Sequence, residues 1–452
     1  MGDGATLQEI DTGANACSVE WCPIAGLESY VACSTYLLAA GEQDDDTNDT
    51  EQGSSKPHVA DTACTAVGAL SSTGATSDEE ELSDKHAGAG QKRSGSIVIH
   101  RLVRDSPAPA ASNQAPPDGF LEEAATASLD GGVLDAKWSQ HPADDGSAVL
   151  ACATSTGRLV LYSLRNVDGV VEERAELRQV ASSDADDSLL LSLDWSRGAV
   201  TSAKIVVSQS DGTLAIWRLN PAGGAPVQAV SPWHAHSLRG GVPTEAWISF
   251  FRRGSGGDDG SFVVSGADDG LMKGWDVRVG GAGPASPAFV CKEHGAGVTA
   301  GQWHPTRQHT FASGSYDESV RIWDARALRD PVTTTPTGGG LWRLKWHPDP
   351  DRGNLLLAAC MHAGVRILDI GSGSNEPEMQ AGQGACPPLG SGAATLADRG
   401  VVAEYTRHGS MAYGSDWCSV SISEKSPRPL VASCSFYDNL LCLWRAPPLW
   451  AC

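Results

Sequence analysis

The chain has 452 residues and a net charge of −22, and its composition is 41% hydrophobic and 19% charged, with 51 glycines and 14 tryptophans. This composition is typical of a turn-rich β protein with a buried core, and it argues against a disordered chain. The negative charge disfavours nucleic acid and anionic membranes as partners, because both repel the protein before contact. We therefore expect a protein partner, no direct nucleic-acid contact and no membrane contact.

The twelve cysteines include no Cys-x-x-Cys pair, and several, such as Cys152, Cys360 and Cys434, lie on apolar strand patterns. Reduced, buried cysteines fit this distribution better than a disulfide or zinc framework. The histidines are dispersed without metal-ligand spacing, so we expect no metal and no cofactor. The chain shows no signal segment and no apolar run near 20 residues, which favours a cytoplasmic protein without a membrane span.

One unit recurs along the chain: an apolar alternation ending in Trp, a small-residue strand, a polar turn, and an apolar strand that often ends in Trp-Asp. The clearest copy runs from Val298 to Arg326. The first-strand ends, in chain order, are Trp21, Trp138, Trp195, Phe251, Trp303, Trp346 and Trp417. The third strands begin at Gly95, Gly157, Gly212, Gly270, Ser319, Gly364 and Asn439. Seven first strands are thus matched by seven third strands.

Each unit alternates with period two and has Gly or Asp at nearly every turn, which predicts a small antiparallel sheet. Such a sheet is not stable alone, but sheets packed face to face around an axis bury both faces and leave only short edges. The sequence therefore predicts an all-β fold, a seven-bladed WD-repeat β-propeller. We expect it to occupy residues 1–452 as one domain and to be monomeric.

The chain ends after the third strand of the seventh unit, so that blade needs a fourth strand from elsewhere. The segment from Ala5 to Asp11 alternates, and we predict that it pairs with residues 440–444. Three stretches interrupt the repeat. Residues 41–94 form an acidic insertion that we expect to be disordered, residues 105–118 a linker, and residues 371–396 a loop insertion in the sixth unit.

A recurrent set of polar residues marks the fifth unit. His294, Ser313 or Ser315, Asp317 and Trp323 have the spacing of the hydrogen-bonded set that is common in WD-repeat blades. A Ser-His-Asp hydrolase triad is the alternative interpretation, but no G-x-S-x-G elbow accompanies it. We therefore expect these residues to be structural.

The sixth and fourth units depart from the repeat. Where the turn of the sixth unit should read Ser-x-Asp, it reads Cys360-Met361-His362. Histidine is a residue type suited to proton transfer near neutral pH, although a surface histidine in a tolerant turn is the alternative. In the fourth unit a long connection leads to Glu245, whose carboxylate we expect near the mouth of the channel.

Several longer stretches carry a family resemblance. They include DTGANACSVEWCP near the start, WHAH followed by EAWISF, SGADDGLMKGWDVR, ASGSYDESVRIWDAR, LLLAACMHAGVRIL and CSFYDNLLCLW. They resemble the diphthine methyl esterases, a WD-repeat family that carries the name diphthine methyltransferase, over nearly the whole chain outside the insertions. The resemblance implies hydrolysis of the methyl ester of methylated diphthine, a modified histidine on translation elongation factor 2, during diphthamide biosynthesis.

Ester hydrolysis needs a base for the attacking oxygen and donors for the oxyanion. We expect His362 as the base, oriented by Glu245 or Asp416, with His236 and Tyr316 as oxyanion donors. The substrate's trimethylammonium group suggests acidic and aromatic contacts, for which the expected residues are Asp268, Asp269, Trp247, Trp342 and Tyr437. The alternatives are a non-catalytic WD-repeat scaffold and, from the WDVR and WDAR ends at 275–278 and 323–326, a ubiquitin-ligase substrate receptor.

Overall fold

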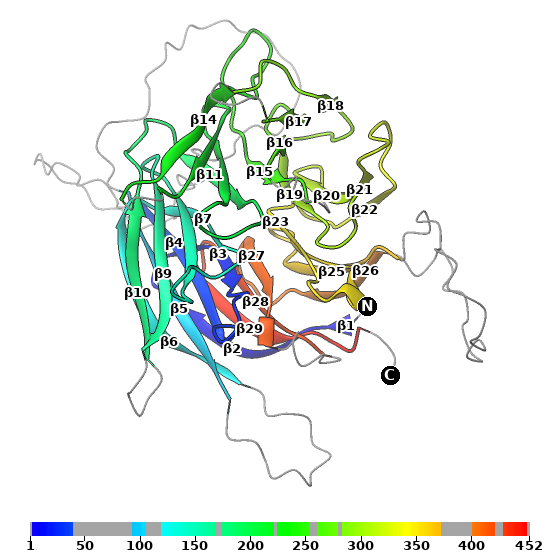
Figure 1. The fold of residues 1–452 in the computed structure, drawn as a ribbon. Coiled ribbons are helices and arrows are strands. Elements are labelled where there is room, and N and C mark those ends of the chain that lie inside the picture. The colour runs from blue at the N-terminus through cyan, green and yellow to red at the C-terminus, as the bar shows by residue number, and fades with distance from the viewer. Residues whose placement is uncertain are drawn as a thin grey trace, which may run out of the picture.

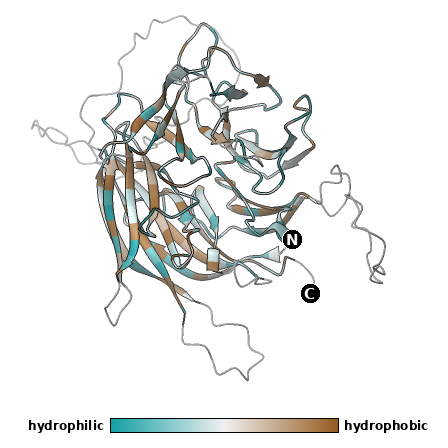
Figure 2. Cartoon of the chain, in the orientation of Figure 1, coloured by the Kyte–Doolittle hydropathy of each residue, from teal (hydrophilic) through white to brown (hydrophobic). Residues whose placement is uncertain are grey.

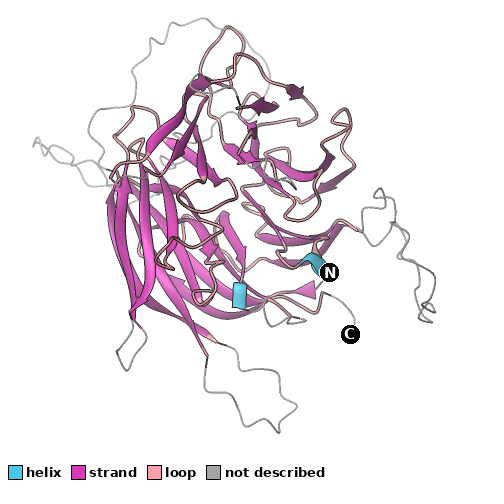
Figure 3. Ribbon diagram, in the orientation of Figure 1, coloured by secondary structure: helices cyan, strands magenta, loops and turns pink. Residues whose placement is uncertain are grey.

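A computed structural model describes residues 2–38, 93–104, 119–167, 174–220, 224–253, 260–278, 283–371, 400–420 and 428–449. These residues form seven antiparallel sheets, or blades, arranged around one axis (Figure 1). Almost all of their regular structure is strand, with a short helical turn at η1 (Pro350–Arg352) (Figure 3). The predicted all-β, seven-bladed propeller is confirmed.

The first three blades follow the chain in order. Blade 1 contains β3 (Asn15–Trp21), β4 (Tyr30–Leu38), β5 (Arg93–Val103) and β6 (Phe120–Asp130). Blade 2 contains β7 (Val133–Trp138), β8 (Ala148–Thr154), β9 (Leu159–Val167) and β10 (Arg174–Ser182). Blade 3 contains β11 (Leu190–Trp195), β12 (Lys204–Gln209), β13 (Thr213–Arg218) and β14 (Val227–His234).

The next two blades repeat this order, and the last two also receive strands from the N-terminal segment. Blade 4 contains β15 (Ile248–Phe251), β16 (Phe262–Gly266), β17 (Met272–Asp276) and β18 (Phe289–Cys291). Blade 5 contains β19 (Val298–Trp303), β20 (Thr310–Ser315), β21 (Ser319–Asp324) and β22 (Thr333–Pro336). Blade 6 contains β23 (Arg343–Trp346), β24 (Leu355–Ala359), β25 (Val365–Asp369) and β26 (Gly400–Tyr405). Blade 7 contains β27 (Ala412–Trp417), β28 (Leu430–Ser435) and β29 (Leu440–Arg445).

Burial is highest in the second strands and falls toward the outer edge of the blades. Every residue of the second strand β8 is buried, because neighbouring blades cover both faces of the sheet. The outermost strand β6 instead alternates between exposed and covered side chains, and hydrophilic and hydrophobic residues are interspersed on the outer strands (Figure 2). Alternation of apolar and polar residues therefore marks strands at the outer edge of a blade, and continuous apolar runs mark strands that are covered on both faces.

The N-terminal segment closes the ring. Strand β2 (Ala5–Asp11) pairs antiparallel with β29, with Ala5 opposite Arg445 and Asp11 opposite Leu440. This pairing confirms the predicted closure. An additional strand, β1 (Gly2–Asp3), pairs parallel with β26 of blade 6, so the segment ties the last two blades together. The sequence did not predict β1, because a two-residue strand has no period to detect.

The predicted insertions fall mainly outside the described residues. The linker at 105–118 and nearly all of the segments at 41–94 and 371–396 lie there. Strand β5 begins at Arg93, so the first insertion ends two residues earlier than we predicted. Among the described residues, no helix is long and apolar enough to span a bilayer.

Four of the tryptophans that end inner strands join neighbouring blades. The indole N–H of Trp138 donates to the carbonyl oxygen of Glu20 at 3.0 Å, and that of Trp195 donates to Lys137 at 2.9 Å. Trp417 donates in the same way to Lys345 at 3.0 Å. Each ring is thus buried with its polar atom satisfied by another blade, which explains why Trp recurs at this position.

Candidate functional site

All seven inner strands run in the same direction along the axis, so their first residues gather at one end of the channel, which we call the upper face. The turns between second and third strands lie at this end as well. In blade 5, His294 and Asp317 are joined by Nδ1 to Oδ2 at 3.1 Å, and His294 Nε2 lies 2.7 Å from Ser313 Oγ. Trp323 Nε1 donates to the same hydroxyl at 2.8 Å. The predicted structural set is confirmed, with Ser313 as its serine.

Blade 4 contains the same set of contacts. His236 Nδ1 lies 3.0 Å from both carboxylate oxygens of Asp269, His236 Nε2 lies 2.7 Å from Ser265 Oγ, and Trp275 Nε1 donates to that hydroxyl at 2.9 Å. Burial lowers the pKa of His236, although Asp269 opposes the shift. Both ring nitrogens are engaged and the residue is buried. His236 is therefore not an available oxyanion donor, and Asp269 faces the blade rather than a substrate; both predictions were wrong.

Blade 6 lacks the set. The register of β24 and β25 places Ala358 where blade 5 has its serine, His362 in place of the aspartate and Leu368 in place of the tryptophan. The His362 side chain is exposed, and no described residue hydrogen-bonds to its ring. The turn that contains His362 is held by blade 7, because the N–H of Ala412 donates to the carbonyl oxygen of Met361 at 3.0 Å. The missing set thus leaves a histidine accessible at the upper face.

Three aromatic rings from three blades meet at the upper face. The ring centroids of Trp247 and Trp342 are 5.6 Å apart, those of Trp247 and Tyr316 are 6.3 Å apart, and those of Tyr316 and Trp342 are 6.4 Å apart. Asp268 accepts a hydrogen bond from the Trp247 indole N–H at 3.0 Å, and its own N–H donates to the carbonyl oxygen of Glu245 at 3.1 Å. We call Trp247, Tyr316, Trp342 and Asp268 the aromatic cluster. The structure brings these four predicted residues together beside Glu245.

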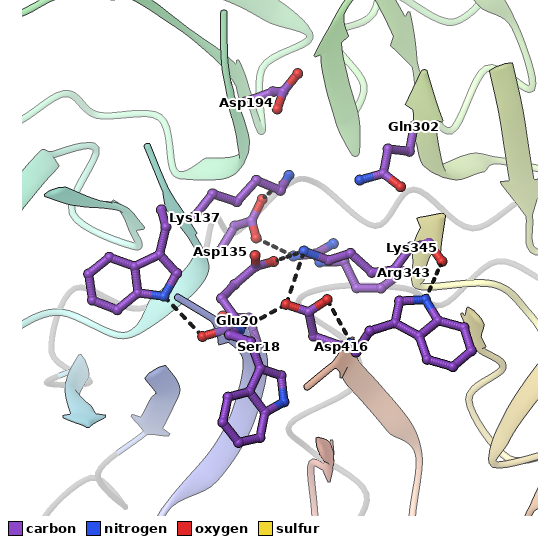
Figure 4. A network of polar contacts seen from close by, with 12 residues as sticks. Ser18, Glu20, Asp135, Lys137, Asp194, Gln302, Arg343, Lys345 and Asp416 are labelled. Carbon is purple, nitrogen blue, oxygen red and sulfur yellow. Dashed lines mark hydrogen bonds and ion pairs between the residues drawn. The ribbon is translucent and has the colours of Figure 1, made fainter. Parts of the chain in front are cut away.

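Deeper in the channel, charged side chains interact across blades (Figure 4). Lys345 of blade 6 forms a short contact with Glu20 of blade 1 and lies 3.8 Å from Asp416 of blade 7. Burial raises the pKa of Glu20 to about 7, against the opposing effect of Lys345. Burial also raises the pKa of Asp416. For Lys345 burial favours the neutral form, but Asp416 and Glu20 outweigh it and raise the pKa.

A second group of charges crosses the channel above the first. Arg343 of blade 6 lies 3.0 Å from Asp135 of blade 2, which also pairs with Lys137 at 3.2 Å and accepts the N–H of Leu193 at 3.0 Å. Burial opposes ionisation of Asp135, but Arg343 and Lys137 outweigh it and lower its pKa. These side chains therefore hold opposite blades together. We call Glu20, Asp135, Lys137, Asp194, Arg253, Arg343, Lys345 and Asp416 the channel network.

With both regions described, comparison with known proteins shows the family. Human diphthine methyltransferase is 31% identical over 441 residues, covering 96% of this chain and 78% of the human protein. A Dictyostelium discoideum homologue is 32% identical over 344 residues, covering 72% and 79% of the two chains. This chain belongs to the diphthine methyltransferase family. The family described as WD domain, G-beta repeat also matches residues 285–324.

A solved structure agrees in fold. One chain in the crystal structure of the mitotic checkpoint complex superimposes with a TM-score of 0.55 over 98% of this chain and 94% of that chain, at 14% identity. At this identity the likeness concerns the fold alone. The relation to the diphthine methyltransferase family therefore rests on sequence.

In this member of the diphthine methyltransferase family, one further predicted residue lies away from the upper face. Asp416 is four residues beyond Ala412 on β27, about 13 Å along the strand, and its carboxylate accepts the N–H of Trp21 at 2.8 Å. It therefore belongs to the channel and does not orient His362, contrary to our prediction. Glu245 and His362 do lie at the same end of the axis.

The sequence analysis missed part of the aromatic surface of this family member. Tyr413 stacks on Trp342 with centroids 4.6 Å apart, and Phe436 lies 5.1 Å from Tyr413. Tyr437, a predicted substrate contact that is 43% exposed, packs edge-on against Phe436 at 5.0 Å. A signal for Tyr413 was present: it precedes the end of its inner strand by four residues, as Trp247 and Trp342 do. Among the described residues, no group of three potential ligands is arranged to hold a metal ion.

Proposed function

We propose that this protein acts in diphthamide biosynthesis as an esterase that hydrolyses the methyl ester of methylated diphthine on translation elongation factor 2. Family membership supports a role on diphthine, because relatives that match most of the chain are named diphthine methyltransferase. The observation that carries the choice of substrate is the aromatic cluster, in which the half-buried Tyr316 and Trp342 pack on the buried Trp247 beside the exposed carboxylate of Asp268.

The cluster suits a trimethylammonium group. A cation above the middle of a triangle with sides of 5.6, 6.3 and 6.4 Å would lie within about 6 Å of all three centroids, the range of cation–π attraction. Among the described residues, neither Asp268 nor Glu245 has an ion pair. Their charge is thus available to a cation, and the indole N–H bound to Asp268 makes the Trp247 ring more electron-rich.

The hydrolytic step follows from the same face. His362 would take a proton from a water molecule, whose oxygen bonds to the ester carbonyl carbon; the C–O bond to the methoxy group then breaks, and methanol leaves with that proton. The Tyr316 hydroxyl would donate to the developing oxyanion, and Glu245, at the same end of the channel, would reach His362 only with substrate bound, since the two residues are not in contact here. The freed carboxylate stays on the elongation factor.

The test is to incubate the full chain with elongation factor 2 bearing the methyl ester and to follow its mass. We expect a loss of one CH₂ unit. A second incubation with unmethylated diphthine and a methyl donor tests methyl transfer, which would add one CH₂ unit instead. No change in either incubation would favour the non-catalytic scaffold.

The His362→Ala variant tests the base. Removal of a general base is expected to lower the rate by about 100-fold or more, while folding should be retained because the side chain is exposed. His141→Ala is the matched control, since His141 is also exposed but follows the far end of an inner strand in blade 2. Full activity of His362→Ala would remove His362 from the mechanism.

A further inference from the structure

The channel network surrounds a cavity of about 60 Å³. None of the aromatic cluster lines this cavity; its polar wall comes from Glu20, Lys137, Asp194, Gln302, Arg343 and Lys345. Gln140 and Arg253, which follow the far ends of the inner strands, also contribute. The cavity therefore lies in the lower half of the channel, and the Arg343–Asp135 pair separates it from the upper face.

We propose that this cavity is a binding site for a small aliphatic carboxylate. Four cationic side chains line it, namely Lys137, Arg253, Arg343 and Lys345, against two acidic ones, Glu20 and Asp194. The other two acids of the channel network, Asp135 and Asp416, pair with these cations from behind the wall. Four cationic groups therefore face the cavity, and because each also pairs with a carboxylate, the preference for an anion rests on the donors that these pairs leave unused.

Donor groups without acceptors point to the same ligand. Arg343 Nε and Arg253 Nη1 are buried and have no hydrogen-bond partner in the described chain. Gln302 uses its side-chain oxygen to accept the N–H of Trp346 at 2.7 Å, and its amide nitrogen, which points toward the channel centre (Figure 4), donates to no described residue. Buried donors are normally satisfied. The two oxygens of a carboxylate would accept from these groups on blades 4, 5 and 6.

The rest of the cavity wall determines the size of the carboxylate ligand and favours an aliphatic tail on it. Ile248, Phe250, Ala300 and Gly301 form an apolar side of the cavity. Phe250 stands where five of the other six blades have a charged residue and blade 5 has Gln302. A cavity of about 60 Å³ holds roughly four water molecules, the size of acetate or propionate. A short aliphatic tail would contact the apolar side while the carboxylate faces the cations.

Glu20 should couple this binding to pH. Its carboxyl faces Lys345 on β23, Asp416 on β27 and Lys137 on β7. A bound anion adds negative charge beside it and so favours its protonated form. With the pKa of Glu20 about 7, the protonated fraction falls about tenfold between pH 6 and pH 8, and the affinity should fall with it.

Isothermal titration of the full chain with propionate at pH 6 and pH 8 tests the proposal. We expect one binding site, an affinity about tenfold lower at pH 8, and weaker binding of inorganic phosphate, which lacks the tail. Arg253→Gln should weaken propionate binding by about tenfold, as expected for a lost charged hydrogen bond. Glu20→Gln should remove most of the pH dependence.

Arg326→Gln is the matched control, because Arg326 pairs with Asp324 on an exposed part of blade 5 and should leave binding unchanged. No binding heat at pH 6, equal affinity in Arg253→Gln and wild type, or phosphate binding tighter than propionate would overturn the proposal. The readout is independent of ester hydrolysis, so a failure here leaves the proposed function standing, and the reverse is also true.

Discussion

The aromatic cluster lies where the inner strands begin and in the turns after second strands, whereas the channel network lies mainly on the inner strands, and the two regions use their charges differently. In the channel, four acids and four bases are largely buried and pair across blades. At the upper face, Asp268 is exposed and Glu245 is half-buried, and neither has an ion pair in the described chain. Charges that pair between blades hold the ring together, whereas charges left unpaired beside aromatic rings can attract a ligand.

The largest expected effect is a loss of stability when a cation of the channel network is removed. Lys345→Met leaves Glu20 and Asp416 without their shared cation, and breaking a buried pair in this way costs about 3 to 5 kcal/mol. Urea denaturation should show this loss in the free energy of unfolding. The exposed Lys292→Met should change it by less than about 0.5 kcal/mol. Equal midpoints for the two variants would mean that the pairs do not stabilise the ring.

A smaller effect concerns the pH dependence of stability. Glu20 keeps its proton to about pH 7 in the folded chain, against a reference pKa of 4.5 for the unfolded chain. The folded state therefore binds more protons between these values, so this group's contribution to the free energy of unfolding falls as pH rises through that window.

Glu20→Gln lacks this titration. The unfolding free energy of the wild type minus that of Glu20→Gln should therefore fall by about 2 to 3 kcal/mol between pH 4.5 and pH 7. The histidines whose pKa burial lowers, such as His408 at about 4, act in the opposite direction but are common to both proteins. Urea denaturation at several pH values measures the difference, and parallel pH curves would contradict the assignment.

The smallest effect belongs to the aromatic cluster. Trp342→Leu keeps an apolar side chain but removes one ring, and a lost cation–π contact of about 0.5 to 2 kcal/mol should lower kcat/KM by roughly 2- to 30-fold. Phe120→Leu is the control, because Phe120 is an exposed aromatic residue on the outer strand of blade 1. An unchanged kcat/KM for Trp342→Leu would place the cation elsewhere.

The candidate site was predicted only in part, for identifiable reasons. The set in blade 4 has the same serine-to-aspartate and serine-to-tryptophan spacing as that in blade 5, but a longer loop separates His236 from Ser265. The longer separation hid the equivalence, so His236 and Asp269 were taken for site residues. Asp416 was misplaced because the sequence does not say how deep along β27 it lies relative to the turn of His362.

The sequence by itself determined the number of blades, the strand that closes the ring, and the turn where blade 6 exchanges aspartate for histidine. These features are local, since they follow from period-two alternation, turn residues and spacing within one repeat. Only the tertiary structure decided that Trp247, Tyr316 and Trp342 share one surface and that Lys345 joins Glu20 to Asp416. Ring closure brings together residues from repeats that are far apart in the chain, and no local pattern encodes which of them will meet.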